Sequence, residues 1–462
     1  MKRAITDDHQ LELIPQTPIP PPHPKTTPIP PPSPVATSPD VPFGDILAAF
    51  TFNGAPTICT ESIGKSFQGE VIRVPAYVNE FWTARQRQGN SLHEISYRAC
   101  FKPQLPRFFI ERLTQPGEIV HDPFMGRGTT LIEAALLGRI PSGCDINPLS
   151  IRLARPRIHP PSLDQIKTRL ATIDFQAADP ASTSEDLLVF YHPETLREIS
   201  ALRRYLLERQ TAGTLDAVDE WIFMVALNRL TGHSNGFFSV YTLPPNQAVS
   251  VKSQRRINER RNQIPERRDV PSIILKKSRI LLSECDAALR ATLASVAPRS
   301  QLLAAPASAT PSIPDGSVSL VVTSPPFLDI VQYATDNWLR GWFAGIDPST
   351  VKITMSTKVA EWQTEMTAVF KELARILRPL GHVAFEVGEV RNNSIRLEEA
   401  VLPCGLAAGL KPILVMINAQ EFTKTANCWG VDNNSSGTNT NRIVLFQKPN
   451  PRQPRHPLND PR

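Results

Sequence analysis

The stretch between residues 118 and 145 constrains the fold of this chain more than any other segment. A short strand-like segment at 118–120 leads into the nine-residue string DPFMGRGTT at 122–130, and a helical pattern then continues to Leu137. Gly138 ends that helix as a natural C-terminal cap, and a second apolar run ends at Asp145. Strand, glycine-rich turn, helix, strand and acidic residue, in this order, predict the start of a doubly wound α/β sheet.

The string at 122–130 predicts a site for one end of a small cofactor. Its glycines allow a tight turn and a close approach of the backbone, and the helix that follows directs free N–H groups at the ligand. The spacing Gly-x-Gly lacks the third glycine of dinucleotide folds, which suits a smaller group such as a carboxylate. Asp145 is placed to bind ribose hydroxyls. The residues predicted to bind the cofactor here are Asp122, Pro123, Phe124, Gly126, Gly128, Thr129, Thr130 and Asp145.

A second string, TSPPF at 323–327, follows an apolar strand predicted at 318–322. One interpretation is a turn that two prolines end. The other is chemical, because the lone pair of an exocyclic base amine is delocalised into the ring, and acceptors aimed at its hydrogens favour the reactive form. The hydroxyl of Ser324 and a carbonyl before a proline offer such acceptors. Two prolines stiffen the backbone there, and Phe327 offers a face on which an extruded base can stack.

Together the two strings resemble the cofactor loop and the catalytic loop of the amino-methylating DNA methyltransferases. The resemblance implies a Rossmann-like class I methyltransferase sheet with a helical insertion between the two motifs. It also implies S-adenosylmethionine as the cofactor and double-stranded DNA as the substrate. In that family, Ser-Pro-Pro followed by an aromatic residue is associated with cytosine methylated at its exocyclic N4 amine. Asp in place of Ser is associated more with adenine, so Ser324 favours cytosine.

The resemblance also assigns roles to single residues and shows one departure from the family pattern. Lys102 and Pro103 are similar to the segment that closes over the methionine end of the cofactor, and Thr323 joins the cofactor-binding set. Relatives often carry an acid before the catalytic strand, near the cofactor adenine, but residues 304–309 contain none, and Asp315 resembles a turn residue. The residues that match the catalytic loop are Ser324, Pro325, Pro326 and Phe327.

The order of the motifs matches a permutation of the fold in which the cofactor loop comes first and the target-reading region lies between the motifs. The chain is rich in proline at its start, which predicts a disordered tail, and its end looks equally loose. We expect helix from about 78 to 113 and a linker at 302–314. The predicted divisions are a tail at 1–45, an N-terminal segment with the cofactor half at 46–158, a helical insertion at 159–300, the catalytic half at 301–448, and a tail at 449–462.

The insertion carries an excess of basic residues between positions 252 and 279. Neutralisation of DNA phosphates would explain this excess, and so would a solvated helix face. A loop at 232–241 mixes polar and aromatic residues, and it either contacts bases or packs into the core. The residues predicted to bind nucleic acid are Arg255, Arg256, Arg260, Arg261, Arg267, Arg268, Phe237 and Phe238.

Composition restricts the class of protein. The formal net charge of +6 is compatible with a nucleic-acid partner. No apolar run approaches the roughly 20 residues of a membrane span, and the first residues lack the apolar core of a secretory signal, so we expect a cytoplasmic protein with no membrane partner. The six cysteines show no CxxC spacing, which predicts no metal site.

Three alternative functions stay open at this stage. They are methylation of adenine N6 in DNA, methylation of a base in RNA, and nucleic-acid binding by a catalytically impaired homologue. A cognate restriction enzyme would be a further partner. The sequence does not indicate the recognised DNA site or the oligomeric state.

Overall fold

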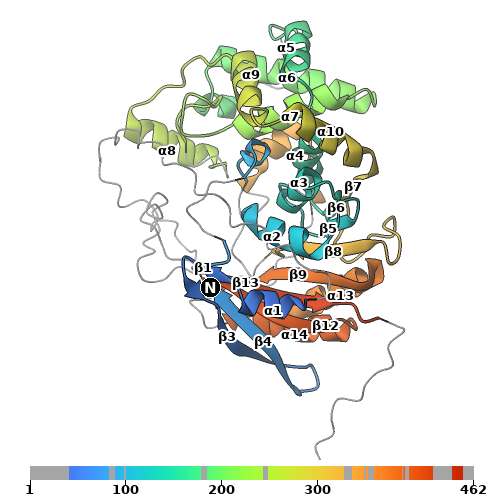
Figure 1. Cartoon of the computed structure of the whole chain (residues 1–462). Helices are drawn as coiled ribbons and strands as arrows, with labels where there is room; N and C mark the ends of the chain where they lie inside the picture. Colours follow the sequence, from blue (N-terminus) through green and yellow to red (C-terminus); the bar gives the residue numbers. More distant parts are fainter. Residues whose placement is uncertain are drawn as a thin grey trace, which may run out of the picture.

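The computed structural model describes residues 41–82, 89–97, 100–177, 185–242, 248–326, 336–347, 350–351, 358–387, 389–390, 395–419 and 440–450. Phe327, residues 1–40 of the predicted N-terminal tail and residues 451–462 of the C-terminal tail lie outside this part of the chain. The described chain forms a sheet-containing half and a layer of helices stacked on it (Figure 1).

A nine-stranded sheet organises the described residues. β7, β6, β5, β8 and β9 are parallel, whereas β13 is antiparallel to its neighbours β9 and β12. The strand order reverses between β5 and β8, as in a Rossmann-like open sheet, which confirms the predicted fold class. In sheet order the strands are β3 (Ile58–Lys65), β4 (Val71–Asn79), β12 (Lys411–Ala419), β13 (Thr440–Gln447), β9 (Leu377–Val387), β8 (Val318–Thr323), β5 (Ile119–Asp122), β6 (Ile140–Asp145) and β7 (Gln301–Ala304).

Helices cover both faces of this sheet. Alternate residues of β8 point to opposite faces, so Leu320 and Val322 pack with α2 (Gln104–Leu113), whereas Val321 packs with α13 (Val359–Ile376). α14 (Leu397–Ala407) lies beside α13, and α3 (Thr129–Leu136) and α4 (Leu149–Ile158) follow β5 and β6. The minor elements near the sheet are α1 (Phe43–Ala48), β1 (Thr51–Phe52), β2 (Ala55–Pro56), β10 (Glu389–Val390) and β11 (Ile395–Arg396).

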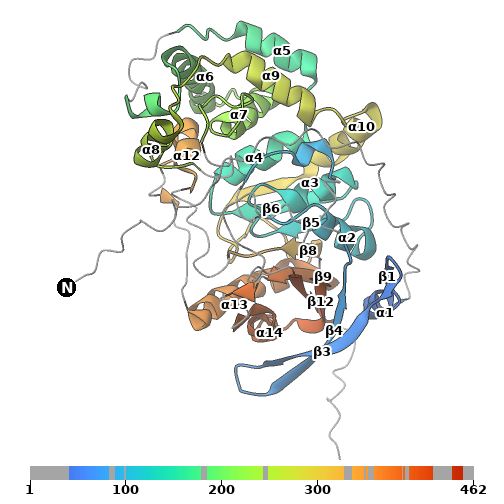
Figure 2. The ribbon, with the colours of Figure 1, turned by 90° about the vertical axis from the view of Figure 1, so that its left-hand side faces the viewer.

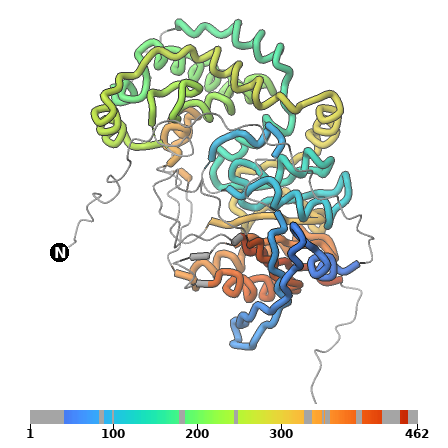
Figure 3. The backbone as a smooth tube through the Cα atoms, turned by 60° about the vertical axis from the view of Figure 1, so that its left-hand side comes forward, coloured from blue at the N-terminus to red at the C-terminus, as the bar shows by residue number. Residues whose placement is uncertain are grey.

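The helical layer comes mainly from the chain between β6 and β7 and arches over the sheet half (Figures 2 and 3). Its central helix, α7, starts with a capping box at Asp216, and Trp221 to Leu227 on it are almost fully buried. The layer also takes in α12, which follows the string TSPPF in the chain and contacts α4, α6 and α7. The helices are α5 (Leu163–Thr172), α6 (Pro193–Thr211), α7 (Ala217–Arg229), α8 (Val251–Arg261), α9 (Val270–Leu281), α10 (Ala287–Val296) and α12 (Trp338–Ala344), with short 3-10 turns at Ser91–His93, Glu185–Val189 and Ala297–Arg299.

Two predicted segments differ from the structure. The helix predicted from 78 to 113 is wrong over most of its length, because β4 extends to Asn79 and a helix begins only at Gln104. β4 instead pairs with β3 and, in parallel, with β12. The predicted linker at 302–314 is wrong at its start, because residues 301–304 form the edge strand β7 beside β6. β4 is partly exposed and β7 is only four residues long. Whether such segments form strands depends on their pairing with neighbouring strands.

Among the described residues, no helix combines the length and apolar character required to cross a membrane. No group of three or more His, Cys, Asp and Glu side chains in the same part of the chain is arranged to hold a metal ion.

Candidate active site

The turn after β5 is built from two glycines in the left-handed region. Gly126 has φ +47° and Gly128 has φ +81°. A Cβ on Gly128 would lie 2.7 Å from the Cβ of Ala154 in α4, so glycine there allows both the turn and the close packing of α4. α3 starts at Thr129, directly after this turn. The predicted loop therefore leads into a helix N-terminus, as an anion site requires.

Asp145, at the end of β6, ties this loop to the next one. Its Oδ2 accepts a hydrogen bond from the Gly126 N–H at 2.9 Å, and its Oδ1 accepts one from the Asn147 N–H at 2.8 Å. Burial raises the pKa of the Asp145 carboxyl, and these two bonds oppose that shift. Each carboxylate oxygen has a second lone pair, so Asp145 can still accept hydrogen bonds from a ligand.

A cavity of about 290 Å³ opens between the loops that follow β5, β6, β7 and β8 and the side of α13. It lies at the carboxyl ends of the parallel strands, where open α/β sheets bind ligands. Its wall combines apolar surface with a few polar groups. The lining residues are Tyr97, Pro123, Phe124, Gly126, Asp145, Ile146, Asn147, Pro306, Ala307, Ser308, Ser324, Pro326, Glu365, Met366, Ala368 and Val369.

The predicted cofactor residues fall into two groups in this structure. Those that line the cavity are Pro123, Phe124, Gly126 and Asp145. Those outside its lining are Lys102, Pro103, Asp122, Gly128, Thr129, Thr130 and Thr323. Of this second group, Lys102 is exposed and Pro103 caps α2, whereas Asp122 and Thr323 are almost fully buried.

Asp122 and Thr323 join the two motifs beneath the cavity. The Thr323 hydroxyl donates a hydrogen bond of 2.6 Å to Asp122 Oδ1, which also accepts the Phe124 N–H at 3.0 Å. The Thr130 hydroxyl donates to the carbonyl oxygen of Val322 at 3.0 Å. Burial raises the pKa of Asp122 to about 7. These bonds fix the string at 323–327 relative to the turn after β5, although about 190 residues separate them in the chain.

Ser324 and Pro326 line the cavity, and Ser324 is hydrogen-bonded to a carboxyl that the sequence analysis missed. This is Glu386, at the end of β9, which is 7% exposed and also accepts a 2.7 Å hydrogen bond from Asn441 Nδ2. Burial raises the pKa of Glu386, and the bonds from Ser324 and Asn441 oppose the shift. A single acid inside the apolar run HVAFEV was the available signal.

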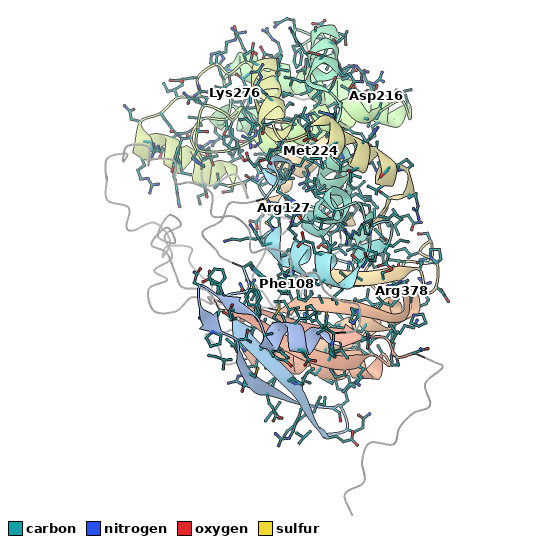
Figure 4. All side chains as sticks on the ribbon, in the orientation of Figure 1. Phe108, Arg127, Asp216, Met224, Lys276 and Arg378 are labelled. Carbon is teal, nitrogen blue, oxygen red and sulfur yellow. The ribbon has the colours of Figure 1, made fainter. Side chains whose placement is uncertain are left out.

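Tyr97 is a second lining residue that sequence reasoning missed, and three parts of the fold hold its segment in place. Arg127 from the cofactor loop donates to the Ile95 carbonyl at 2.8 Å. Asn228 from α7 accepts the Ser96 N–H at 2.9 Å, and Arg340 from α12 donates to the Ser96 carbonyl at 3.1 Å. In Figure 4, Arg127 lies between Met224 of the helical layer and Phe108 beside the sheet.

The predicted nucleic-acid residues lie in the helical layer, outside the cavity. Four of the arginines lie on or at the end of α8, where Arg255 pairs with Asp186 at 3.1 Å and Arg261 stacks on the Tyr241 ring at 3.8 Å. Arg256 and Arg260 are exposed and make no ion pair with another described residue. Arg267 pairs with Glu194, and Arg268 with Glu266.

Phe237 and Phe238 occupy core positions. Phe238 has no exposed surface, and Phe237 is 5% exposed, with the Arg229 guanidinium 4.0 Å from its ring centroid. A Cβ on Gly232 would lie 2.3 Å from the Phe237 ring, so the loop folds tightly over it. Rings buried in this way offer no free face to a base, which supports the alternative of a packing loop.

Comparison with known proteins finds one family and several partial relatives. Residues 70–155 match the family model described as DNA methylase. The type II methyltransferase M.MjaII of Methanocaldococcus jannaschii is 35% identical over 71 residues, which cover 15% of this chain and 13% of that protein. M.BsoBI of Geobacillus stearothermophilus is 21% identical over 335 residues, which cover 64% of this chain and 61% of that protein.

M.MvaI of Kocuria varians is 33% identical over 100 residues, 21% of this chain and 20% of that protein. The chain thus matches between 13% and 61% of the length of these relatives. Among solved structures, TrmN from Thermus thermophilus is 12% identical with a TM-score of 0.30, over 76% of this chain and 50% of that one. The rRNA methyltransferase aviRa from Streptomyces viridochromogenes is 14% identical with a TM-score of 0.30, over 77% of this chain and 89% of that one.

Proposed function

We propose that this chain, which matches the DNA methylase family model over residues 70–155, transfers a methyl group from S-adenosylmethionine to the exocyclic N4 amine of cytosine in double-stranded DNA. One observation carries the proposal. Ser324, the centre of the catalytic string, lines the same cavity as Gly126 and Asp145 of the cofactor loops. Donor and acceptor sites are thereby adjacent, as a direct transfer between two bound molecules requires.

The residues around the cavity fit S-adenosylmethionine. The turn at Gly126 and the N-terminus of α3 suit the carboxylate of its methionine end. The free lone pairs of Asp145 suit ribose hydroxyls, and Ile146, which is 39% exposed, offers apolar surface for a purine. When bound, S-adenosylmethionine supplies a methyl group already activated as a sulfonium.

Ser324 is the group that we assign to the target amine. Its hydroxyl proton is directed at Glu386, so the lone pairs of its oxygen can accept a hydrogen bond from an amine N–H. Its carbonyl, which precedes Pro325, can accept the second amine hydrogen. Acceptors on both hydrogens favour the pyramidal amine, in which the nitrogen lone pair is available for attack.

Glu386 completes a route for the proton that the methylated amine must lose. The amine N–H bond breaks and a new O–H bond forms on Ser324, whose own proton passes to the Glu386 carboxylate. Burial raises the pKa of Glu386, which makes its carboxylate a stronger proton acceptor. Asn441 holds the carboxylate through its 2.7 Å bond, so Glu386 keeps its orientation towards Ser324.

The choice of cytosine rests on Ser324 in the first position of the Ser-Pro-Pro string. The assignment of duplex DNA as substrate is supported by the exposed arginines of α8, since phosphate contacts from such a helix orient a protein on DNA. A cognate restriction enzyme and the cytoplasm as location remain part of the proposal.

The test is to incubate the purified protein with isotope-labelled S-adenosylmethionine and unmethylated plasmid DNA, and to identify the labelled nucleoside by mass spectrometry. We expect N4-methylcytosine. Label on N6-methyladenine would refute the cytosine assignment and keep the enzyme class. Label only on RNA, or cofactor binding without transfer to any nucleic acid, would reject DNA methylation.

Variants test the proposed roles of the two side chains. Ser324→Ala should abolish methylation and leave cofactor binding unchanged. Glu386→Gln keeps a hydrogen-bond acceptor but takes no proton, so kcat should fall by about 10²-fold or more and the acid limb of its pH profile should disappear. Ser295→Ala on α10 and Glu361→Gln on α13 are matched controls outside the cavity lining, and both should keep full activity.

A further inference from the structure

The wall of the cavity on the side of β7 comes from uncharged residues. Pro306, Ala307 and Ser308 line the cavity at this position. Asp315, the next acid in the chain, forms an ion pair with Arg375 and is 79% exposed. Among the residues that the structure describes, the carboxyls that line the cavity are those of Asp145 and of Glu365 on α13.

Hydrogen bonds pin the segment after β7 against α13. The backbone N–H and the hydroxyl of Thr310 both donate to Glu372 Oε1, at 2.7 and 2.6 Å. Arg375 donates to the carbonyl of Thr310 at 3.0 Å and pairs with Glu372 at 2.7 Å. The hydrogen bond from Arg375 lowers the pKa of Glu372 to about 2, so Glu372 stays ionised and committed to this anchor.

Glu365 lies on the same face of α13 as Glu372, seven residues or two helical turns earlier. That places it about 10 Å along the helix axis from the anchor, beside the cavity. It forms no hydrogen bond or ion pair with any other described residue, whereas Glu361, one turn away, pairs with Lys358 at 3.0 Å. Burial and the nearby charge of Glu361 raise the pKa of Glu365.

Two groups of lining residues lie near one another. Tyr97 lies beside Gly126 of the turn after β5. Ala307 of the segment after β7 packs against the cluster that contains Met366 and Val369 of α13, and these residues and the exposed Ile146 give the cavity apolar surface. A planar base with an amino group at its edge suits a wall that combines such apolar surface with an unpaired carboxylate.

We propose that Glu365 recognises the adenine of the cofactor by accepting a hydrogen bond from its 6-amino group, in place of the acid that is missing after β7. This inference rests on the proposed use of S-adenosylmethionine. A carboxylate only accepts hydrogen bonds, so Glu365 would favour a 6-amino purine and disfavour a 6-oxo purine at this position. The role belongs to a helix that follows the catalytic strand, and not to the β7 loop.

Calorimetric titration with two unreactive probes tests the assignment. S-adenosylhomocysteine carries the 6-amino group, and S-inosylhomocysteine carries an oxygen in its place. The wild-type protein should bind the adenosyl probe about tenfold or more tightly than the inosyl probe, as expected for a bond to a charged acceptor against an unmatched oxygen. Glu365→Gln should bring this ratio close to one, because an amide both accepts and donates. Glu361→Gln is the matched control and should keep the wild-type ratio.

The outcomes separate the inference from the function on which it rests. If Glu365→Gln binds the adenosyl probe with the wild-type preference, Glu365 does not read the base, and the inference alone is overturned. If the wild-type protein binds neither probe, the proposed cofactor is wrong and the inference fails with it. Equal thermal unfolding of the two Gln variants ensures that a changed ratio reports the site and not the fold.

Discussion

Replacing Asp122 by Asn should remove a pH-dependent loss of stability that this carboxyl imposes on the folded protein. Asp122 is 1% exposed, and burial raises its pKa from 3.8 to about 7 despite the bonds from Thr323 and Phe124. The folded state therefore holds a proton that the unfolded state releases near pH 4. Relative to an ionised Asp122, the bound proton stabilises the folded protein. This contribution to the free energy of unfolding is fully present below pH 3.8 and is lost as the pH rises through about 7.

The size of the effect follows from the shift. The pKa of Asp122 in the folded protein lies about three above its unfolded value, which corresponds to roughly 4 kcal/mol of unfolding free energy. About 3 kcal/mol of this is lost between pH 5 and pH 8. Asn keeps an oxygen that accepts from Thr323 and does not titrate. The free energy of unfolding in urea should be measured for both proteins without cofactor at pH 5 and at pH 8. The value for Asp122→Asn minus that for the wild type should rise by about 3 kcal/mol from pH 5 to pH 8.

A matched control makes the experiment specific. Glu259 is an exposed acid on α8, and Glu259→Gln should give a curve of stability against pH parallel to that of the wild type. If Asp122→Asn also runs parallel to the wild type, Asp122 is ionised in the folded protein at pH 5. The description of a protonated carboxyl that joins the two motifs would then be refuted.

Three further predictions concern the framework and the DNA contact. Gly128→Ala should lower the free energy of unfolding in urea by about 2 kcal/mol or more, because it adds a clash with Ala154 to the cost of a positive φ. The control Gly213→Ala has φ +67° and open space around it, so it carries only the backbone cost, and equal losses in the two variants would contradict this account. Arg157→Met should cost about 3 kcal/mol, because the buried guanidinium donates to the carbonyls of Leu92, Leu153 and Arg127; a loss below 1 kcal/mol would show that water replaces these bonds. Replacing Arg256 and Arg260 by Gln should weaken duplex binding and reduce the magnitude of the slope of log affinity against log salt concentration by about two. The same replacement of the exposed Lys65 and Arg73 on the β3–β4 hairpin is the control, and an equal effect of the two double variants would contradict phosphate binding by α8.

The sequence predicted most reliably those elements whose signal is local. The strands predicted at 118–120 and 318–322 lie next to glycine or proline turns, and they correspond to β5 (Ile119–Asp122) and β8 (Val318–Thr323) at the centre of the sheet. The edge strands were harder. β7 was predicted as a linker because its Ala- and Pro-rich surroundings resemble one, and its strand state depends on pairing with β6. β3 is exposed along most of its length and β4 mixes exposed with buried positions, so neither gives the local signal of a central strand.

In the candidate site, too, the residues with a local sequence signal were predicted and those that depend on strand pairing were missed. Ser324 and Glu386 are an example of each. Ser324 was predicted because Ser-Pro-Pro is a contiguous string whose chemistry is visible in the sequence. Glu386 lies 62 residues later and gains its meaning from the register between β8 and β9, where Thr323 pairs with Phe385. That parallel register places the next residue of each strand, Ser324 and Glu386, side by side at the carboxyl edge of the sheet. A slip of one residue would turn Glu386 to the opposite face and end its contact with Ser324. The acid partner of Ser324 is therefore a property of strand pairing, which no local pattern in the sequence specifies.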